Sequence, residues 1–109
     1  MQYLVSASGG PGYASPEEAL KVLEDLVMPL FESLMRLESE KKILAGGVPL
    51  GDRALTFILE AASHDEVDRL LRGLPMWSLF KWEVIPLETF AGRAAQEREF
   101  VQRLTHAMF

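Results

Sequence analysis

The sequence predicts an α+β fold with four strands and two main helices in the order βαββαβ, followed by an extra C-terminal helix. Three observations carry this prediction: two serine-initiated capping boxes, a leucine repeat at steps of three and four residues, and four short segments suited to strands. The chain has 109 residues, of which 49% are hydrophobic and 25% charged, as in ordinary globular proteins. We therefore expect one domain spanning residues 1–109.

The first two elements are a strand over Gln2–Ala7 and a long helix. The helix begins at Ser15–Glu18, which supplies an N-cap serine, a proline at the first helical position and a glutamate at the third. Pro29 lies inside the helix and removes a backbone hydrogen bond, so we expect a kink or two helical pieces there. The apolar stripe expected to face the sheet consists of Leu20, Leu23, Val27, Leu30, Leu34 and Leu37.

Two further strands and a shorter helix follow. Lys42–Val48 and Arg53–Ala61 have strand composition, and the pair Gly46–Gly47 indicates a bulge or a close backbone approach. A second capping box starts at Ser63, and Gly73 can end the helix that it begins. The chain therefore has two of its helices flanking a central hairpin.

The last strand is predicted over Lys81–Leu87, and Glu88 to the C-terminus is predicted to form a final helix. Arg93 and Glu97 would form an exposed pair on this helix. Its apolar side would consist of Phe90, Ala94, Val101, Leu104 and Met108. Right-handed crossovers then favour a four-stranded antiparallel sheet of spatial order 4-1-3-2 with both main helices on one face, the ferredoxin-like arrangement.

Alternation along the strands predicts two different sheet faces. The helix-covered face would carry Leu55, Phe57, Leu59 and Ala61. The opposite face would carry a polar set that we expect to lie close together: Gln2, Ser6, Thr56, Glu60 and Glu83. If Glu60 and Glu83 are forced together, the pKa of one carboxyl group rises toward acid–base use, and these two are the candidate catalytic residues. The alternative is a solvated set that pairs with Arg53 and Lys81.

Several classes of function are disfavoured by composition. The net charge of −5 argues against binding to a phosphate backbone, so no nucleic-acid partner is expected. There is no cysteine, and the two histidines are far apart in sequence, so we expect no disulfide, metal or other cofactor. No signal peptide or membrane-spanning run is visible, so we expect no membrane association and a cytoplasmic location.

The segment Leu74–Val84, which reads LPMWSLFKWEV, follows the helical stretch Asp65–Leu71 and resembles the muconolactone isomerase family. The resemblance extends over Arg36–Leu87, about half of the chain. It implies a dimeric α+β barrel, a small lactone bound between sheet and helices near the subunit boundary, and a helix-borne carboxylate that moves a proton. In this chain Leu30 lies near the position of that acid, and the nearest carboxylate is Glu32.

A pocket for a small aromatic or lactone-like ligand is expected beside this segment. Its wall would be formed by Tyr3, Phe31, Met35, Trp77, Phe80 and Trp82. The alternative is that these side chains belong to the core and a dimer interface, where aromatic residues are also common. The loop Gly9–Gly12 lacks the spacing of a dinucleotide-binding turn and is expected to be a connection that can cover a pocket.

Three functions remain open at this point. The first is a cofactor-free isomerase that acts by proton transfer on a small cyclic carbonyl compound or lactone, and the second is a cofactor-independent monooxygenase on the same fold. The third is a non-catalytic small-molecule-binding or oligomerisation module, in which Met28, Met35 and the C-terminal helix build an oligomer. The expected protein partner is another copy of the chain, in a homodimer or a higher oligomer.

Overall fold

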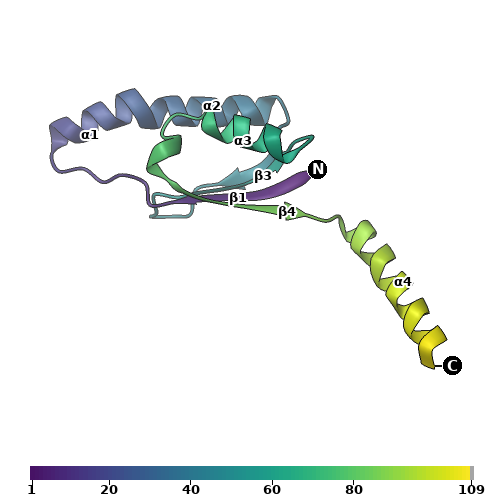
Figure 1. Cartoon of the computed structure of the whole chain (residues 1–109). Helices are drawn as coiled ribbons and strands as arrows, with labels where there is room; N and C mark the ends of the chain where they lie inside the picture. Colours follow the sequence, from purple (N-terminus) through teal and green to yellow (C-terminus); the bar gives the residue numbers. More distant parts are fainter. Residues whose placement is uncertain (109) are drawn as a thin grey trace.

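The computed structural model describes residues 1–108, and its elements follow the predicted order (Figure 1). The strands are β1 Gln2–Ser8, β2 Ile43–Gly47, β3 Leu55–Glu60 and β4 Lys81–Leu87. The helices are α1 Pro16–Val22, the π-helical η1 Leu23–Val27, α2 Met28–Ser39, α3 His64–Arg72, the short 3₁₀ helix η2 Trp77–Leu79 and α4 Phe90–Met108. The α+β, ferredoxin-like prediction is confirmed.

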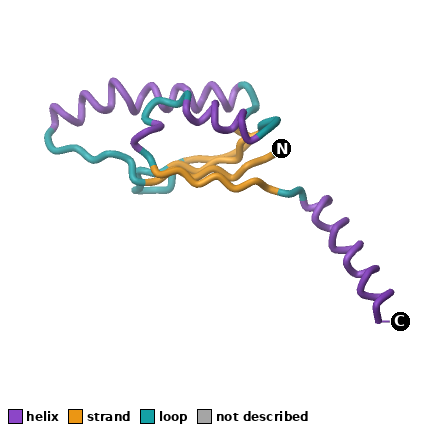
Figure 2. The backbone as a smooth tube through the Cα atoms, viewed as in Figure 1, coloured by secondary structure: helices purple, strands orange, loops and turns teal. Residues whose placement is uncertain are grey.

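The four strands form one antiparallel sheet in the order β2-β3-β1-β4, which is the predicted order read from the other edge. β1 lies between β3 and β4, so the residues of these three strands align in rows across the sheet. Figure 2 shows the long helix and α3 on one side of the sheet, whereas no described helix packs against the opposite side. We call that opposite side the open face.

The long helix does not break at Pro29. α1, η1 and α2 follow one another without interruption, and the irregularity is a π-helical turn just before the proline, in which the backbone N–H of Met28 donates to the carbonyl oxygen of Leu23. Proline has no N–H, so a carbonyl group in the preceding turn loses its partner, and a wider turn re-pairs the neighbouring groups. The expected kink or break is therefore replaced by a widened turn.

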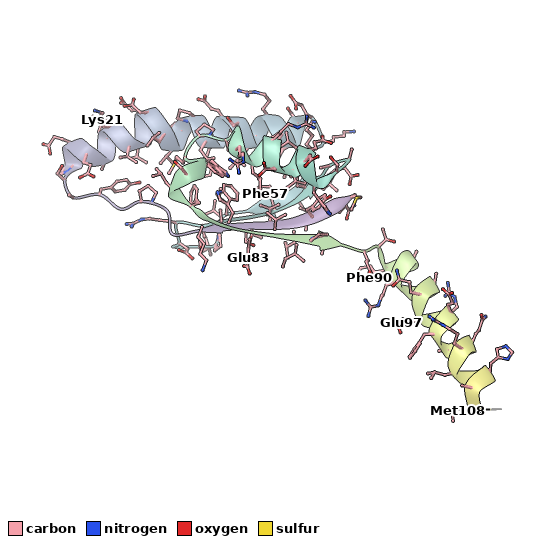
Figure 3. The ribbon with its side chains drawn as sticks, in the orientation of Figure 1. Lys21, Phe57, Glu83, Phe90, Glu97 and Met108 are labelled. Carbon is pink, nitrogen blue, oxygen red and sulfur yellow. The ribbon has the colours of Figure 1, made fainter. Side chains whose placement is uncertain are left out.

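The core lies between the sheet and the helices. Val5, Phe57 and Leu59 are buried beneath the helices, and Phe57 is visible in this layer in Figure 3. The predicted division of the sheet into an apolar and a mixed face is confirmed by these burial values. The start of the leucine stripe is not buried, since Leu20 is 58% exposed. The helix therefore extends past the sheet at its N-terminal end, which sequence periodicity does not reveal.

The close backbone approach predicted as one of two alternatives at the glycine pair is confirmed, and a bulge lies just before the pair. The register of β2 against β3 shifts between Ile43 and Ala45. Gly46 then adopts a φ of +154°, and a Cβ atom there would overlap the carbonyl oxygen of Thr56 and the Cβ of Phe57. The backbones of β2 and β3 approach each other too closely at this point for any side chain.

α4 projects away from the rest of the protein. Figure 1 shows it leaving the end of β4 and descending on the side of the open face. It has no buried residue and, within residues 1–108, no substantial contact with another element. The predicted pair is present, with Arg93 Nε 2.8 Å from Glu97 Oε1. No described helix is long and apolar enough to cross a membrane.

Candidate functional site

One apolar hollow lies between the helical layer and the loops at the end of the sheet. Its cavity volume is about 170 Å³. We call it the Arg53 pocket, and its lining residues are Gly10, Pro11, Tyr13, Val27, Leu30, Phe31, Val48, Asp52, Arg53, Ala54, Met76 and Phe80. Apolar cavities of about 150 Å³ bind benzene, so the volume suits one six-membered ring.

The polar groups of the Arg53 pocket lie at its mouth. The guanidinium of Arg53 stands 5.6 Å from the centre of the Tyr13 ring, within the range of a cation–π contact. The backbone of Arg53 is held on both sides: its carbonyl oxygen accepts from the Gly10 N–H at 3.1 Å, and its own N–H donates to Asp52 Oδ1 at 2.7 Å. These contacts fix the loop Gly9–Ala14 against the β2–β3 connection, and both Asp52 and Arg53 line the pocket.

The inner wall of the pocket is apolar. Leu30 is only 2% exposed and lines the pocket, whereas the exposed Glu32 does not line it. Met76 also lines it, with a left-handed backbone (φ +66°), which costs an L-residue about 1–2 kcal/mol. Its side chain is buried, so packing holds this conformation. No carboxylate borne on the long helix enters the pocket.

The predicted aromatic wall is not a single surface. Phe31 and Phe80 line the Arg53 pocket, while Met35 lines a separate groove beside β2 and Tyr3 a hollow beside α3. Trp77 and Trp82 form a corner behind Phe80. In this corner the Trp82 indole N–H donates to the Trp77 carbonyl oxygen at 2.9 Å, and the rings of Phe80 and Trp82 meet edge to face. Of the six predicted wall residues, Phe31 and Phe80 therefore line the Arg53 pocket. The two tryptophans do not line it, but Trp82 packs against Phe80.

A second hollow, of about 270 Å³, lies on the open face. Thr56, Ser6 and Glu83 form one row across β3, β1 and β4, and the hydroxyl groups of Ser6 and Thr56 are 2.9 Å apart. Lys81 and Trp82 also line this hollow. Figure 3 shows Glu83 directed away from the helices on this side of the sheet. Three members of the predicted polar set are thus brought together.

Glu60 is separate from this row, which corrects the expected carboxylate pair. Glu60 aligns with Gln2, and Glu83 aligns with Ser6, four residues further along β1. At about 3.4 Å per residue, the two rows are roughly 14 Å apart, too far for one carboxylate to act directly on the other. Glu60 instead forms an ion pair with the N-terminal ammonium group at 3.0 Å.

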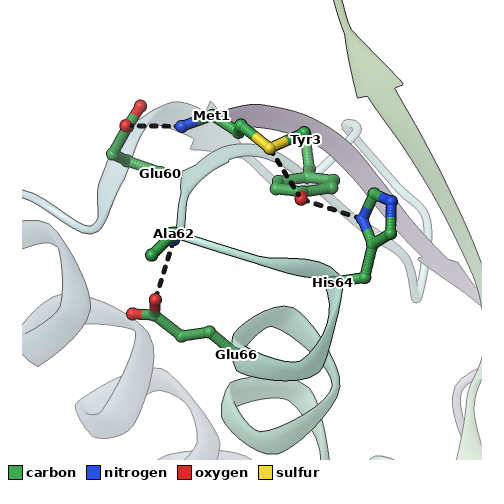
Figure 4. A network of polar contacts seen from close by, with 6 residues as sticks. All are labelled: Met1, Tyr3, Glu60, Ala62, His64 and Glu66. Carbon is green, nitrogen blue, oxygen red and sulfur yellow. Dashed lines mark hydrogen bonds and ion pairs between the residues drawn. The ribbon is translucent and has the colours of Figure 1, made fainter.

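Tyr3 and His64 form a contact that the sequence analysis missed. The Tyr3 hydroxyl group lies 2.9 Å from His64 Nδ1, as Figure 4 shows. β1 starts beside the end of β3, and α3 begins four residues after β3, so residues 3 and 64 meet at the same end of the sheet. The antiparallel pairing of these strands was the signal that could have found the contact.

The same region holds the start of α3 in place. Ser63 Oγ accepts from the backbone N–H of Glu66, and Glu66 Oε2 accepts from the Ala62 N–H at 2.8 Å (Figure 4). The hydrogen bond from Ala62 lowers the pKa of Glu66 from its ordinary value of 4.5, with Lys42 adding to the effect. Because the pKa is lower in the folded chain, the interaction stabilises the fold above the unfolded pKa and is lost as the pH falls through the folded one.

The fold is similar to that of solved protein structures. No family model matches the chain, and no curated protein matches it. Among solved structures, it is similar to muconolactone isomerase, with a TM-score of 0.67 and 21% identity over 82% of this chain and 90% of that chain. It is also similar to 5-chloro-2-hydroxyhydroquinone dehydrochlorinase from Burkholderia phenoliruptrix AC1100, solved in complex with 2,5-dihydroxybenzoquinone. That match has a TM-score of 0.61 and 26% identity over 81% of this chain and 94% of that chain.

Proposed function

The chain has a muconolactone isomerase-like fold, and from this we propose that it is a cofactor-free enzyme that moves a proton within a small cyclic carbonyl compound. The observation that carries the proposal is the Arg53 pocket, an apolar hollow of single-ring size with a cation and a carboxylate at its mouth. The names of the two similar enzymes refer to a lactone and to a hydroxylated ring compound, which agrees with such a pocket.

The proposed chemistry uses Asp52 and Arg53. A ring carbonyl directed toward the guanidinium makes the hydrogen on the adjacent carbon acidic. The substrate would also hold a C=C bond one carbon further round the ring. Asp52 takes the proton, the C–H electron pair forms a C=C bond to the carbonyl carbon, and the C=O pair moves to the oxygen, where Arg53 stabilises the negative charge of the resulting dienolate. Asp52 then returns the proton to the far carbon of the original C=C bond, so that the C=O bond re-forms, the C=C bond lies next to it, and the product is an isomer with no co-reactant consumed. Phe31 and Phe80 would hold the ring against the wall.

The open-face row of Ser6, Thr56 and Glu83 is the competing site. Its hollow holds a carboxylate beside a hydroxyl pair, so Glu83 remains a candidate proton carrier. Glu60 is the weaker candidate because the N-terminal ammonium group occupies its carboxylate. The two sites lie on opposite faces of the sheet and can be separated by mutation.

Solvent-deuterium incorporation tests the proposed function. The wild-type protein in D₂O is expected to introduce deuterium into an unsaturated lactone at a carbon next to the carbonyl group. Asp52→Asn is expected to slow this by about 100-fold or more, since a positioned acid–base group contributes about 10²–10⁴. Glu83→Gln should retain the wild-type rate. If Glu83→Gln alone loses the exchange activity, the catalytic site lies on the open face instead. If the wild-type protein binds the lactone but exchanges no deuterium, the protein is a non-catalytic binding module.

We also propose that the protein is a homodimer whose sheets pack face to face. The open face carries Leu4, Ile58 and Ile85 in one row between its polar rows and Leu87 beside Gln2, and Ile85 is 47% exposed in a single chain. Apolar strands exposed on one side of a sheet are stabilised when a second sheet covers them at about 10 Å. The exposed methionines of the long helix and α4 would then lie outside the barrel and be free for further contacts.

A further inference from the structure

α4 carries an apolar stripe with nothing from its own chain against it. Phe90 is 98% exposed, Val101 59% and Leu104 45%. At 100° per residue, Phe100 and Met108 fall on the same side of the helix, and Arg98 and Arg103 border it. A free helix of 19 residues with this pattern gains stability chiefly by burying its apolar side on another surface.

We propose that this surface is the groove between α2 and β2 of a second copy of the chain, an inference that rests on the proposed homodimer. We call it the edge groove. Its cavity volume is about 180 Å³, and it is lined by Phe31, Leu34, Met35, Ile43 and Val48 with Glu38 at its rim. Met35 is 55% exposed there and Val48 is 44% exposed, so the groove presents apolar surface that a second helix can bury.

The direction of α4 supports this target. α4 leaves β4 on the side of the open face, where the second copy would lie (Figure 1). Leu87 at the end of β4 shares a row with Gln2 and Glu60, and the Glu60 N–H donates to the carbonyl oxygen of Lys42, just before β2. The exit of α4 and the start of β2 are thus at the same end of the sheet. A two-fold axis parallel to the strands would place the partner's β2 beneath β4.

The length of α4 agrees with the same arrangement. The partner's sheet would lie about 10 Å below and its helical layer about 10 Å further. From Phe90 to Leu104 is a rise of about 21 Å at 1.5 Å per residue, so Leu104 would reach the level of α2. Val101 would lie near the partner's β2 edge and Leu104 near Met35.

Charge favours the long helix over other exposed apolar surfaces. Within residues 16–39 acidic side chains outnumber basic ones by six to two, whereas α4 has three arginines and two glutamates. In another groove, beside α3, Asp68 is already paired with Arg72 at 2.9 Å. The arginines that border the α4 stripe would therefore lie near carboxylates such as Glu38, which lines the edge groove and has no ion-pair partner within residues 1–108.

Cysteine cross-linking tests the contact in the full chain, which has no cysteine of its own. Light scattering is expected to give a dimer at micromolar concentration. Oxidation of the double variant Met35→Cys, Leu104→Cys should then yield a covalent dimer on a non-reducing gel. The matched pair Met35→Cys, Gln102→Cys, whose second thiol lies on the opposite side of α4, should not cross-link.

A second pair of variants does not depend on disulfide geometry. Val101→Asp with Leu104→Asp is expected to weaken the dimer at least 100-fold, while Gln102→Asp with His106→Asp should leave its affinity within about threefold. Both pairs lie on α4, outside the folded body, so circular dichroism should show the body intact.

Each failure has a separate meaning. A dimer that survives Val101→Asp with Leu104→Asp and does not cross-link overturns the α4 contact and leaves the homodimer standing. If the two cysteines form a disulfide within one chain, seen in a band of monomer size, α4 contacts the edge groove of its own chain and the contact with a second copy is wrong. A wild-type monomer in solution overturns both the contact and the dimer, and deuterium exchange by that monomer would leave the enzyme proposal intact.

Discussion

Replacing Arg53 with glutamine is expected to reduce the rate of deuterium exchange by about 100- to 1,000-fold, the usual loss when one group that stabilises an oxyanion is removed. The reason is that Arg53 is the one cation among the described residues that line its pocket, and its guanidinium lies beside the Tyr13 ring. Arg53 contacts Gly10 through its backbone carbonyl oxygen and Asp52 through its backbone N–H, so replacing its side chain leaves both hydrogen bonds in place. Exchange rates and thermal melting, measured in parallel, separate function from stability.

Arg72→Gln is the matched control. Arg72 is also exposed and also stands over an aromatic ring, 4.7 Å from the centre of Trp77, but it does not line the Arg53 pocket. Its replacement should leave the exchange rate within about twofold. Equal rates in Arg53→Gln and the wild type would exclude the guanidinium from the reaction, and equal losses in both variants would indicate a nonspecific effect of surface charge.

Gly46→Ala is expected to lower the free energy of unfolding by about 2–6 kcal/mol, because a clash and an unfavourable backbone angle act together and each costs about 1–3 kcal/mol. The added Cβ would meet the backbone of β3 at Thr56 and Phe57, where neither strand can move without breaking the pairing of β2 and β3. Chemical denaturation followed by circular dichroism measures the difference.

Gly47→Ala tests the same pair of residues without the clash. A Cβ at Gly47 would have no heavy atom within 4 Å, so its effect should stay within about 0.5 kcal/mol. If the two alanine variants have the same stability, the close approach of β2 and β3 at Gly46 is wrong.

The fold was predictable because its signals are local. Ser15 and Ser63 cap helices through hydrogen bonds within four residues, and alternation in Leu55–Glu60 determines which side chains face the core. The overhang of the long helix was not predictable, since Leu20 and Leu30 occupy equivalent places in the repeat. Only the length of the sheet beneath them decides that Leu30 is buried and Leu20 is not.

The candidate site was less predictable because loops form it. Arg53 and Tyr13 are 40 residues apart and meet only because the Gly10 N–H ties the first loop to the β2–β3 connection. From the sequence, Arg53 is predicted only as a possible ion-pair partner for the open-face carboxylates. Strand order alone places Glu60 and Glu83 close together, because it does not give the register that separates their rows. The contact between Tyr3 and His64 also depends on the register of β1 against β3, so the sequence predicts Tyr3 only as part of the aromatic wall.

The location of ring binding tests the central claim most directly. We expect a titration with 2,5-dihydroxybenzoquinone, followed by amide chemical shifts in ¹H–¹⁵N spectra, to move the signals of Gly10, Gly12 and Arg53 at the Arg53 pocket. The signals of Ser6, Thr56 and Glu83 should stay in place at the same ligand concentration. Shifts confined to that open-face row, with the Arg53 pocket unchanged, would contradict the proposed site.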